Sequence, residues 1–169
     1  MKMLKKLLAV VLTGAMALTL LTACGGNAVT DKDFADALTD IAKVKNENAT
    51  FTPRAEEREM ARKLAALLEG KATERGSEGA IAEILDYDNG GANAKNFVWW
   101  GAVLADKIGT SGQAFQIEQH LLNTNGDNDL GNKKPADERH MGTALCKMLD
   151  DDGNPITVRI IVVTAEPKA

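Results

Sequence analysis

The residue types that carry most enzyme chemistry are scarce in this chain. Its 169 residues include two cysteines, two histidines and two serines, and aromatic residues make up only 4%. The chain has no Gly-x-Ser-x-Gly elbow, P-loop, dinucleotide-binding glycine fingerprint or zinc-ligand spacing such as His-Glu-x-x-His. The sequence therefore argues against a serine hydrolase or a nucleotide-cofactor enzyme. It predicts no cofactor and no metal site, and it favours a protein without catalytic activity.

An excess of basic residues is also missing. Lys and Arg number 20 against 24 Asp and Glu, which gives a net charge of −4. Residues 1–23 contain Lys2, Lys5 and Lys6 and no acid, so the net charge of the chain from residue 24 onward falls to −7. Affinity for nucleic acid depends on clustered Lys and Arg that neutralise phosphates. The charge therefore excludes nucleic acid as a partner.

The first residues have the pattern of an export signal. A basic start at residues 1–6 is followed by an apolar run at residues 7–20, the order found in secretory signals. The next four residues, Leu21-Thr22-Ala23-Cys24, resemble the lipobox of bacterial lipoproteins, in which signal peptidase II cuts before the cysteine and a diacylglyceryl group is joined to its sulfur. This resemblance implies a signal peptide at 1–23, palmitate-type acylation at Cys24 and a lipidated tether at 24–29.

The alternative is an uncleaved anchor that spans the membrane. About 17 apolar residues, interrupted by Gly14 and two threonines, lie at the lower limit of spanning length, and such an anchor gives Cys24 no role. The lipidated tether at residues 24–29 reaches about 20 Å when it is extended. We therefore expect a protein held by lipid at the extracytoplasmic face of the cell membrane, close to the headgroups.

Apolar residues at spacings of three and four predict about five amphipathic helices in one domain over residues 30–169. These helices are expected near residues 30–46, 53–68, 77–85, 97–108 and 114–122. The fourth rests on the stripe formed by Phe97, Trp100, Leu104 and Ile108. In the second helix, charges of alternating sign between residues 54 and 63 are interpreted as a solvated face with local ion pairs and no function.

From Gly142 onward the apolar period changes from 3.6 to 2. Two alternating runs, on either side of a turn at residues 151–155, predict a C-terminal β-hairpin whose second strand is central and covered by helices. A further strand is expected near residues 49–51, and residues 123–135 are interpreted as a long surface loop. The predicted fold class is α+β: about five helices on a small antiparallel sheet, with an α-β-α sandwich as one arrangement.

A few residues are candidates for a site, although each also has a structural interpretation. Glu83, His120 and His140 are the weak candidates for a composite catalytic or ligand site, and Trp99, placed beside the helix stripe, is a candidate stacking platform for a ligand. Cys146, on the inward face of a strand, is expected to be a buried structural thiol. The run Asn125–Asp129 begins like a calcium loop but lacks the glycine and glutamate that an EF-hand needs.

Three segments resemble parts of the CAP domain, also called the SCP domain. They are His140–Cys146, which leads into the final hairpin, Gly79–Ile84, and His120–Leu122. The resemblance implies an α-β-α sandwich, secretion and a cleft lined by His and Glu that binds a ligand or a divalent metal. The sequence departs from the family pattern at Ile84, where the family has asparagine.

The expected function is that of a membrane-anchored extracytoplasmic lipoprotein, a non-catalytic binding or interaction module of the cell envelope. Besides the membrane, its partner is an unidentified protein, glycan or small molecule. The alternative is a CAP-like domain whose His/Glu cleft binds a divalent metal or small ligand and is capable of hydrolysis.

Overall fold

The computed structural model describes residues 29–106 and 108–168. The expected signal peptide at 1–23, Cys24 and the tether as far as residue 28 lie outside these residues. Asp31–Ala169 forms one compact unit. In the part of the chain that is described, no helix combines the length and the apolar character needed to cross a bilayer.

Four of the predicted helices are present among the described residues. They are α2 (Asp31–Val44), α3 (Ala55–Leu68), α4 (Glu78–Leu85) and α5 (Thr110–Leu121). Their apolar stripes are buried, as at Phe34 and Leu38 of α2. Helix α3 begins later than the sequence predicts, because Pro53 ends a strand and Arg54 takes an extended N-cap conformation.

Four strands, β1 (Thr50–Pro53), β2 (Phe97–Leu104), β3 (Glu138–Leu149) and β4 (Pro155–Ala165), form one sheet in the order β1-β3-β4-β2. The hairpin β3–β4 and the short strand β1 confirm the predictions. The antiparallel sheet was a wrong prediction, because β1 runs parallel to β3. Helices α3, α4 and α5 lie between these two strands in the chain, and a parallel pair needs such a crossover connection.

The helix predicted at residues 97–108 is wrong, because Phe97–Leu104 forms strand β2. The stripe from Phe97 to Leu104 fits a helical period by chance, since this segment pairs with β4 along its whole length, from Phe97 opposite Ala165 to Leu104 opposite Val158. Aromatic and β-branched residues suit a pleated surface. The helix count is therefore four in place of five.

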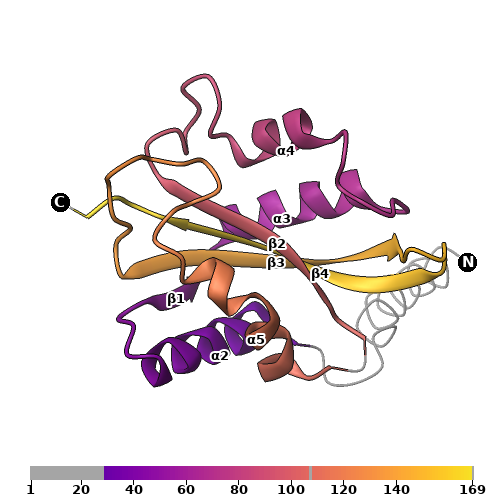
Figure 1. The fold of residues 1–169 in the computed structure, drawn as a ribbon, viewed down its shortest axis with the longest axis horizontal. Coiled ribbons are helices and arrows are strands. Elements are labelled where there is room, and N and C mark those ends of the chain that lie inside the picture. The colour runs from indigo at the N-terminus through magenta and orange to yellow at the C-terminus, as the bar shows by residue number, and fades with distance from the viewer. Residues whose placement is uncertain (1–28, 107, 169) are drawn as a thin grey trace, which may run out of the picture. The chain divides into compact units, whose positions relative to one another are not determined.

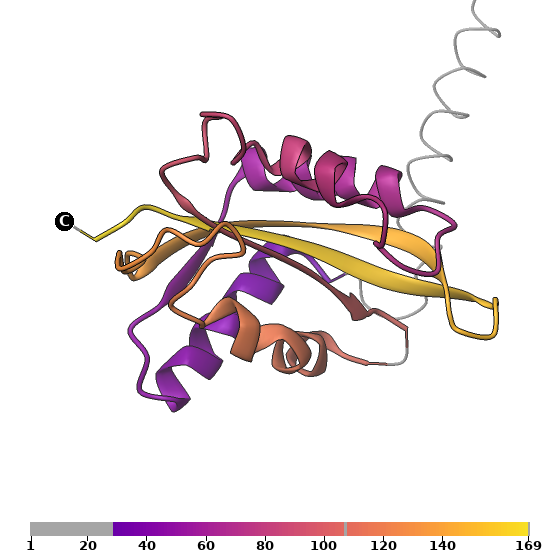
Figure 2. The ribbon, with the colours of Figure 1, turned by 45° about the horizontal axis from the view of Figure 1, so that its top comes forward.

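Helices cover both faces of the sheet. Helices α3 and α4 lie on one face and α2 and α5 on the other (Figures 1 and 2). Between them, β4 is buried from Val158 to Ala165, as predicted for a central strand. Cys146 faces α3, where its Sγ donates a hydrogen bond to the Ala65 carbonyl at 3.2 Å and burial raises the pKa of the thiol to about 12. The buried structural thiol is confirmed.

A glycine sets the distance between α3 and the sheet. A Cβ atom placed on Gly142 of β3 would lie 2.0 Å from the backbone nitrogen of Arg58 and 2.3 Å from its Cα. No rotamer change can relieve such a contact, because the atoms it would strike belong to the helix backbone. The absence of a side chain at Gly142 therefore lets the first turns of α3 rest directly on β3.

A buried carboxylate fixes the same end of α3. The Glu57 side chain is fully buried and accepts hydrogen bonds from Arg54 Nε at 2.7 Å and from Thr164 Oγ1 at 2.6 Å. Burial alone would raise the pKa of Glu57, but these hydrogen bonds outweigh it and hold the pKa below its ordinary value. A lowered carboxyl pKa stabilises the fold above the unfolded pKa of about 4.3, and this stabilisation is lost as the pH falls through the folded pKa.

We expect Glu57→Gln to lower the free energy of unfolding at pH 7 by about 2 kcal/mol, since it replaces charged hydrogen bonds with neutral ones. The difference from the unchanged protein should shrink as the pH falls below the unfolded pKa of about 4.3 and through the lowered folded pKa of Glu57. Urea unfolding between pH 3 and pH 7 measures both effects. Glu56→Gln, one residue away and exposed, is the control and should change stability little. A Glu57 effect that is constant across this pH range would contradict the assignment.

Candidate functional site

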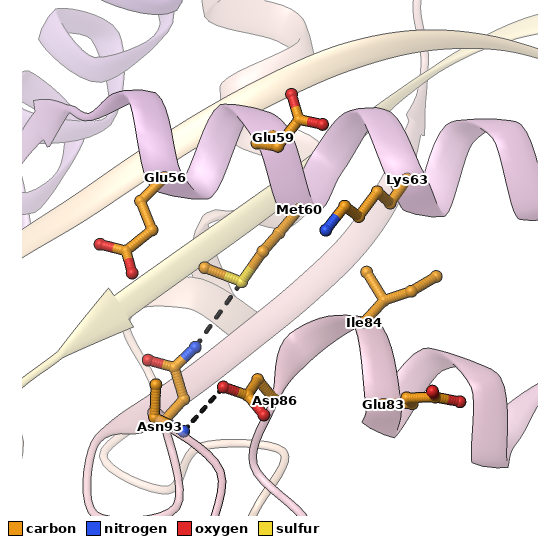
Figure 3. A pocket seen from close by; sticks show the side chains of 9 residues that line it. Glu56, Glu59, Met60, Lys63, Glu83, Ile84, Asp86 and Asn93 are labelled. Carbon is orange, nitrogen blue, oxygen red and sulfur yellow. Dashed lines mark hydrogen bonds between the residues drawn. The ribbon is translucent and has the colours of Figure 1, made fainter.

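A cavity lies between α3, α4 and the segment that follows α4. Its volume is about 540 Å³, and Figure 3 shows the side chains around it. It is lined by Glu56, Glu59, Met60, Lys63, Glu83, Ile84, Asp86, Ala92 and Asn93. We call this cavity the α3–α4 groove.

Helical periodicity places the α3 side of the groove. Glu56, Met60 and Lys63 follow one another at spacings of four and three, and Glu59 lies three residues after Glu56 and four before Lys63, so the four residues lie on neighbouring parts of one side of the helix. Met60 points toward Asn93, Glu56 and Lys63 extend from the same side of the helix, and Glu59 points away from Asn93 (Figure 3). The charges of this helix, interpreted from sequence as a solvated face, therefore also form one wall of a cavity.

The opposite wall is held by the end of α4. Asp86 takes a left-handed conformation with φ 55°, and its N–H donates to the Glu83 carbonyl at 3.2 Å. Its Oδ2 accepts a hydrogen bond from the Ala92 N–H at 2.7 Å, which ties the loop after α4 back to the helix. Asn93 is buried and donates to the Leu85 carbonyl at 2.8 Å and toward the Met60 sulfur at 3.6 Å (Figure 3). The floor of the groove is therefore fixed by the fold.

The groove is acidic above an apolar floor. The residues that line it include four carboxylates, from Glu56, Glu59, Glu83 and Asp86, and one ammonium group, from Lys63. In the described part of the chain, no group of three or more His, Cys, Asp or Glu side chains is arranged to hold a metal ion. The groove therefore suits an organic cation, such as an amine or guanidinium on an aliphatic stem that can pack on Met60 and Ile84.

The structure does not bring the three weak catalytic candidates together. Glu83 lines the α3–α4 groove, whereas His120 lies on α5, which covers the other face of the sheet. His140 lies on β3, and β4 and β2 separate it from the outer edge of β2 that His120 contacts. Neighbouring strands are about 4.8 Å apart. A composite site of these residues has no support in the geometry.

His120 instead joins α5 to the loop at 123–129. Its Nε2 lies 3.2 Å from Asp127 Oδ1 and 3.1 Å from the Trp100 carbonyl oxygen. The hydrogen bond with Asp127 raises the pKa of His120, against the opposing effect of burial. His140 is different, since its Nδ1 is buried without a hydrogen-bond partner among the described residues.

Trp99, the weak candidate for a stacking platform, is fully buried, and its neighbour Trp100 is partly exposed. Successive side chains of a strand point to opposite faces of the sheet, so Trp99 and Trp100 lie on opposite faces. In a helix they would lie on neighbouring sides. Trp99 stacks on Phe97, donates from Nε1 to the Asn125 carbonyl at 2.9 Å, and lies under the Arg139 guanidinium, 4.7 Å from its ring centroid. Trp99 is therefore part of the core.

Comparison with protein-family models, with curated proteins and with solved structures found no match to this chain. The CAP-like resemblance therefore stays a hypothesis that rests on the short segments quoted for it. The interpretation of function relies on the α3–α4 groove and on the pattern of the first residues.

Proposed function

We propose that the protein is a lipid-anchored extracytoplasmic binding module of a bacterial cell envelope, and that it holds a cationic ligand in the α3–α4 groove. The observation that carries the binding role is the excess of carboxylates around the apolar floor formed by Met60 and Ile84. The lipobox at Leu21–Cys24 supports the anchor. The separation of Glu83, His120 and His140 supports a role without catalysis.

The charge of the groove decides which ligands it takes. A cation placed between the α3 and α4 carboxylates gains attraction from both walls, while its aliphatic stem removes apolar surface from water. An anion meets three more negative charges than positive ones and is repelled. The basic side chains of a partner protein or a small polyamine have this chemistry.

Titration of the purified chain with trilysine at low ionic strength tests the proposal. We expect saturable binding, weakened about tenfold by the pair Glu59→Gln and Glu83→Gln, since two carboxylates near one cation each contribute up to about 1 kcal/mol. Calorimetry measures the affinity.

The control pair, Glu138→Gln and Asp152→Asn, removes the same charge from exposed positions outside the groove. It should change the affinity less than twofold. If both pairs of substitutions weakened trilysine binding equally, the effect would come from the overall charge of the protein and not from a site in the groove. Binding of triglutamate as tight as that of trilysine would exclude the groove as a cation site.

A further inference from the structure

Strand β2 is an outer strand of the sheet, so one of its edges faces away from β4 (Figure 1). Backbone groups of a strand point alternately to its two sides. Ala105, just beyond the strand, donates to Thr157 at the start of β4, so the odd-numbered residues face β4. The even-numbered residues Val98, Trp100, Ala102 and Leu104 therefore direct their N–H and C=O groups outward.

The chain itself covers the first half of this edge. Asp127 N–H donates to the Val98 carbonyl at 2.7 Å, and Asn128 Oδ1 accepts from Val98 N–H at 3.2 Å. Asp127 Oδ2 accepts from Trp100 N–H at 2.8 Å, and His120 contacts the Trp100 carbonyl. The loop at 123–129, interpreted from sequence as a surface loop, thus occupies the place of an additional strand along Val98 and Trp100.

The second half of the edge is uncovered. Within the described chain, the outward N–H and C=O groups of Ala102 and Leu104 have no hydrogen-bond partner. Ala102 is exposed, and Leu104 is exposed to 45%. Proteins protect outer strands with charged residues or proline, but Phe97–Leu104 contains neither. This segment has the features of a strand that accepts another strand.

A cavity lies beside the uncovered groups. Its volume is about 370 Å³, and it is lined by Glu74, Trp100, Gly101, Ala102, His120 and Asp127. Its lining includes the carboxylates of Glu74 and Asp127 and the imidazole of His120, which already contacts Asp127. A basic side chain has charge complementary to this cavity, whereas an acidic one is repelled.

We propose that β2 binds an extended peptide segment of a partner protein by strand addition at Ala102–Leu104, with a Lys or Arg side chain of that segment in the cavity beside Trp100. The backbone groups of the two residues supply up to four hydrogen bonds, and the cavity supplies the preference for a basic side chain. This site is separate from the α3–α4 groove, so neither the groove nor the lipid anchor has to be right for it to exist.

The test uses an eight-residue peptide of alternating lysine and valine and the purified chain, followed by NMR hydrogen exchange. The amides of Ala102 and Leu104 should exchange rapidly in the free protein and become at least tenfold slower at saturation. The matched peptide of alternating glutamate and valine should bind at least tenfold more weakly. The groove pair Glu59→Gln and Glu83→Gln should leave the protection at Ala102 unchanged, which separates this site from the groove.

Ala102→Pro removes one outward N–H without removing a bond to β4, a position where an outer strand tolerates proline. It should weaken the lysine peptide about tenfold, while Ala102→Val, which keeps the N–H, should not. Thermal melting checks that the variant is folded, and Leu104→Pro replaces it if it is not.

Three results would overturn the proposal. They are unchanged exchange at Ala102 and Leu104 with peptide present, equal binding of the glutamate peptide, and protection of the same amides by self-association of the chain without peptide. The last result would assign the edge to a second copy of the protein.

Discussion

Gly142→Ala should lower the free energy of unfolding by at least about 3 kcal/mol. The added methyl group would meet the backbone of α3 at Arg58, and backbone atoms move only if the helix moves. Overpacking of a well-packed core costs about 1–3 kcal/mol when flexible side chains can yield, so a clash with a helix backbone should cost more. Shifting α3 would also disturb the hydrogen bonds of Glu57 with Arg54 and Thr164. Urea unfolding followed by circular dichroism measures the loss.

Gly79→Ala is the control for this substitution. Gly79 lies in α4, and a Cβ atom there would meet no atom within 4 Å. Alanine is favoured over glycine inside a helix by about 0.5–1 kcal/mol, so this variant should gain stability. A Gly142→Ala variant as stable as the unchanged protein would show that α3 does not rest on β3 as described.

Cys24→Ser should abolish lipid attachment completely. In the proposed lipoprotein, the Cys24 sulfur forms the thioether to the diacylglyceryl group, and a serine hydroxyl is a far weaker nucleophile than a thiolate. Cleavage before residue 24 should then fail, so that an unmodified precursor of 18.0 kDa accumulates. Incorporation of labelled palmitate and intact-mass analysis, in a bacterial host that processes lipoproteins, measure both effects.

The other cysteine is the control. Cys146→Ala removes a buried thiol far from the lipobox in sequence and should leave palmitate incorporation unchanged. If the unchanged protein keeps residues 1–23 and carries no lipid, the apolar run is a membrane-spanning anchor and the lipoprotein proposal fails. Two or more acyl chains hold a protein stably at a membrane, whereas one chain binds only marginally, so the number of chains found by mass also matters.

The sequence predicted the elements that have one unambiguous period. The stripes of α2 and α3 and the alternation of β3 and β4 each fit one template, and the structure confirms them. Strand β2 fits two templates, because Phe97, Trp100 and Leu104 have helical spacing within a strand whose other residues are also apolar. Only its pairing with β4, about 60 residues away in the chain, decides between them. That information is absent from any local window.

The same limit applies to the candidate sites. Glu83 lines a cavity, but its neighbours there belong to α3 and the end of α4, and the histidines predicted beside it lie elsewhere. The alternating charges of α3 predict a solvated face for Glu56 and Glu59, because their own helix gives no sign of the opposite wall of the cavity. The pattern of residues 125–129 predicts a plain loop, although Asp127 forms hydrogen bonds with the edge of β2. Each role depends on what lies opposite the residue, which helical or strand periodicity does not specify.

The position of β4 has a consequence for how the chain reaches its fold. The central strand is the last regular element of the described chain, and β1 pairs with β3 across 88 residues, from Thr50 to Glu138. Contacts between segments so distant in sequence require closure of long loops before they give any stabilisation, which slows folding. The sheet on which the helices pack therefore cannot be completed until β4 is available to join β2 to β3. Assembly of this domain should be a late and cooperative event.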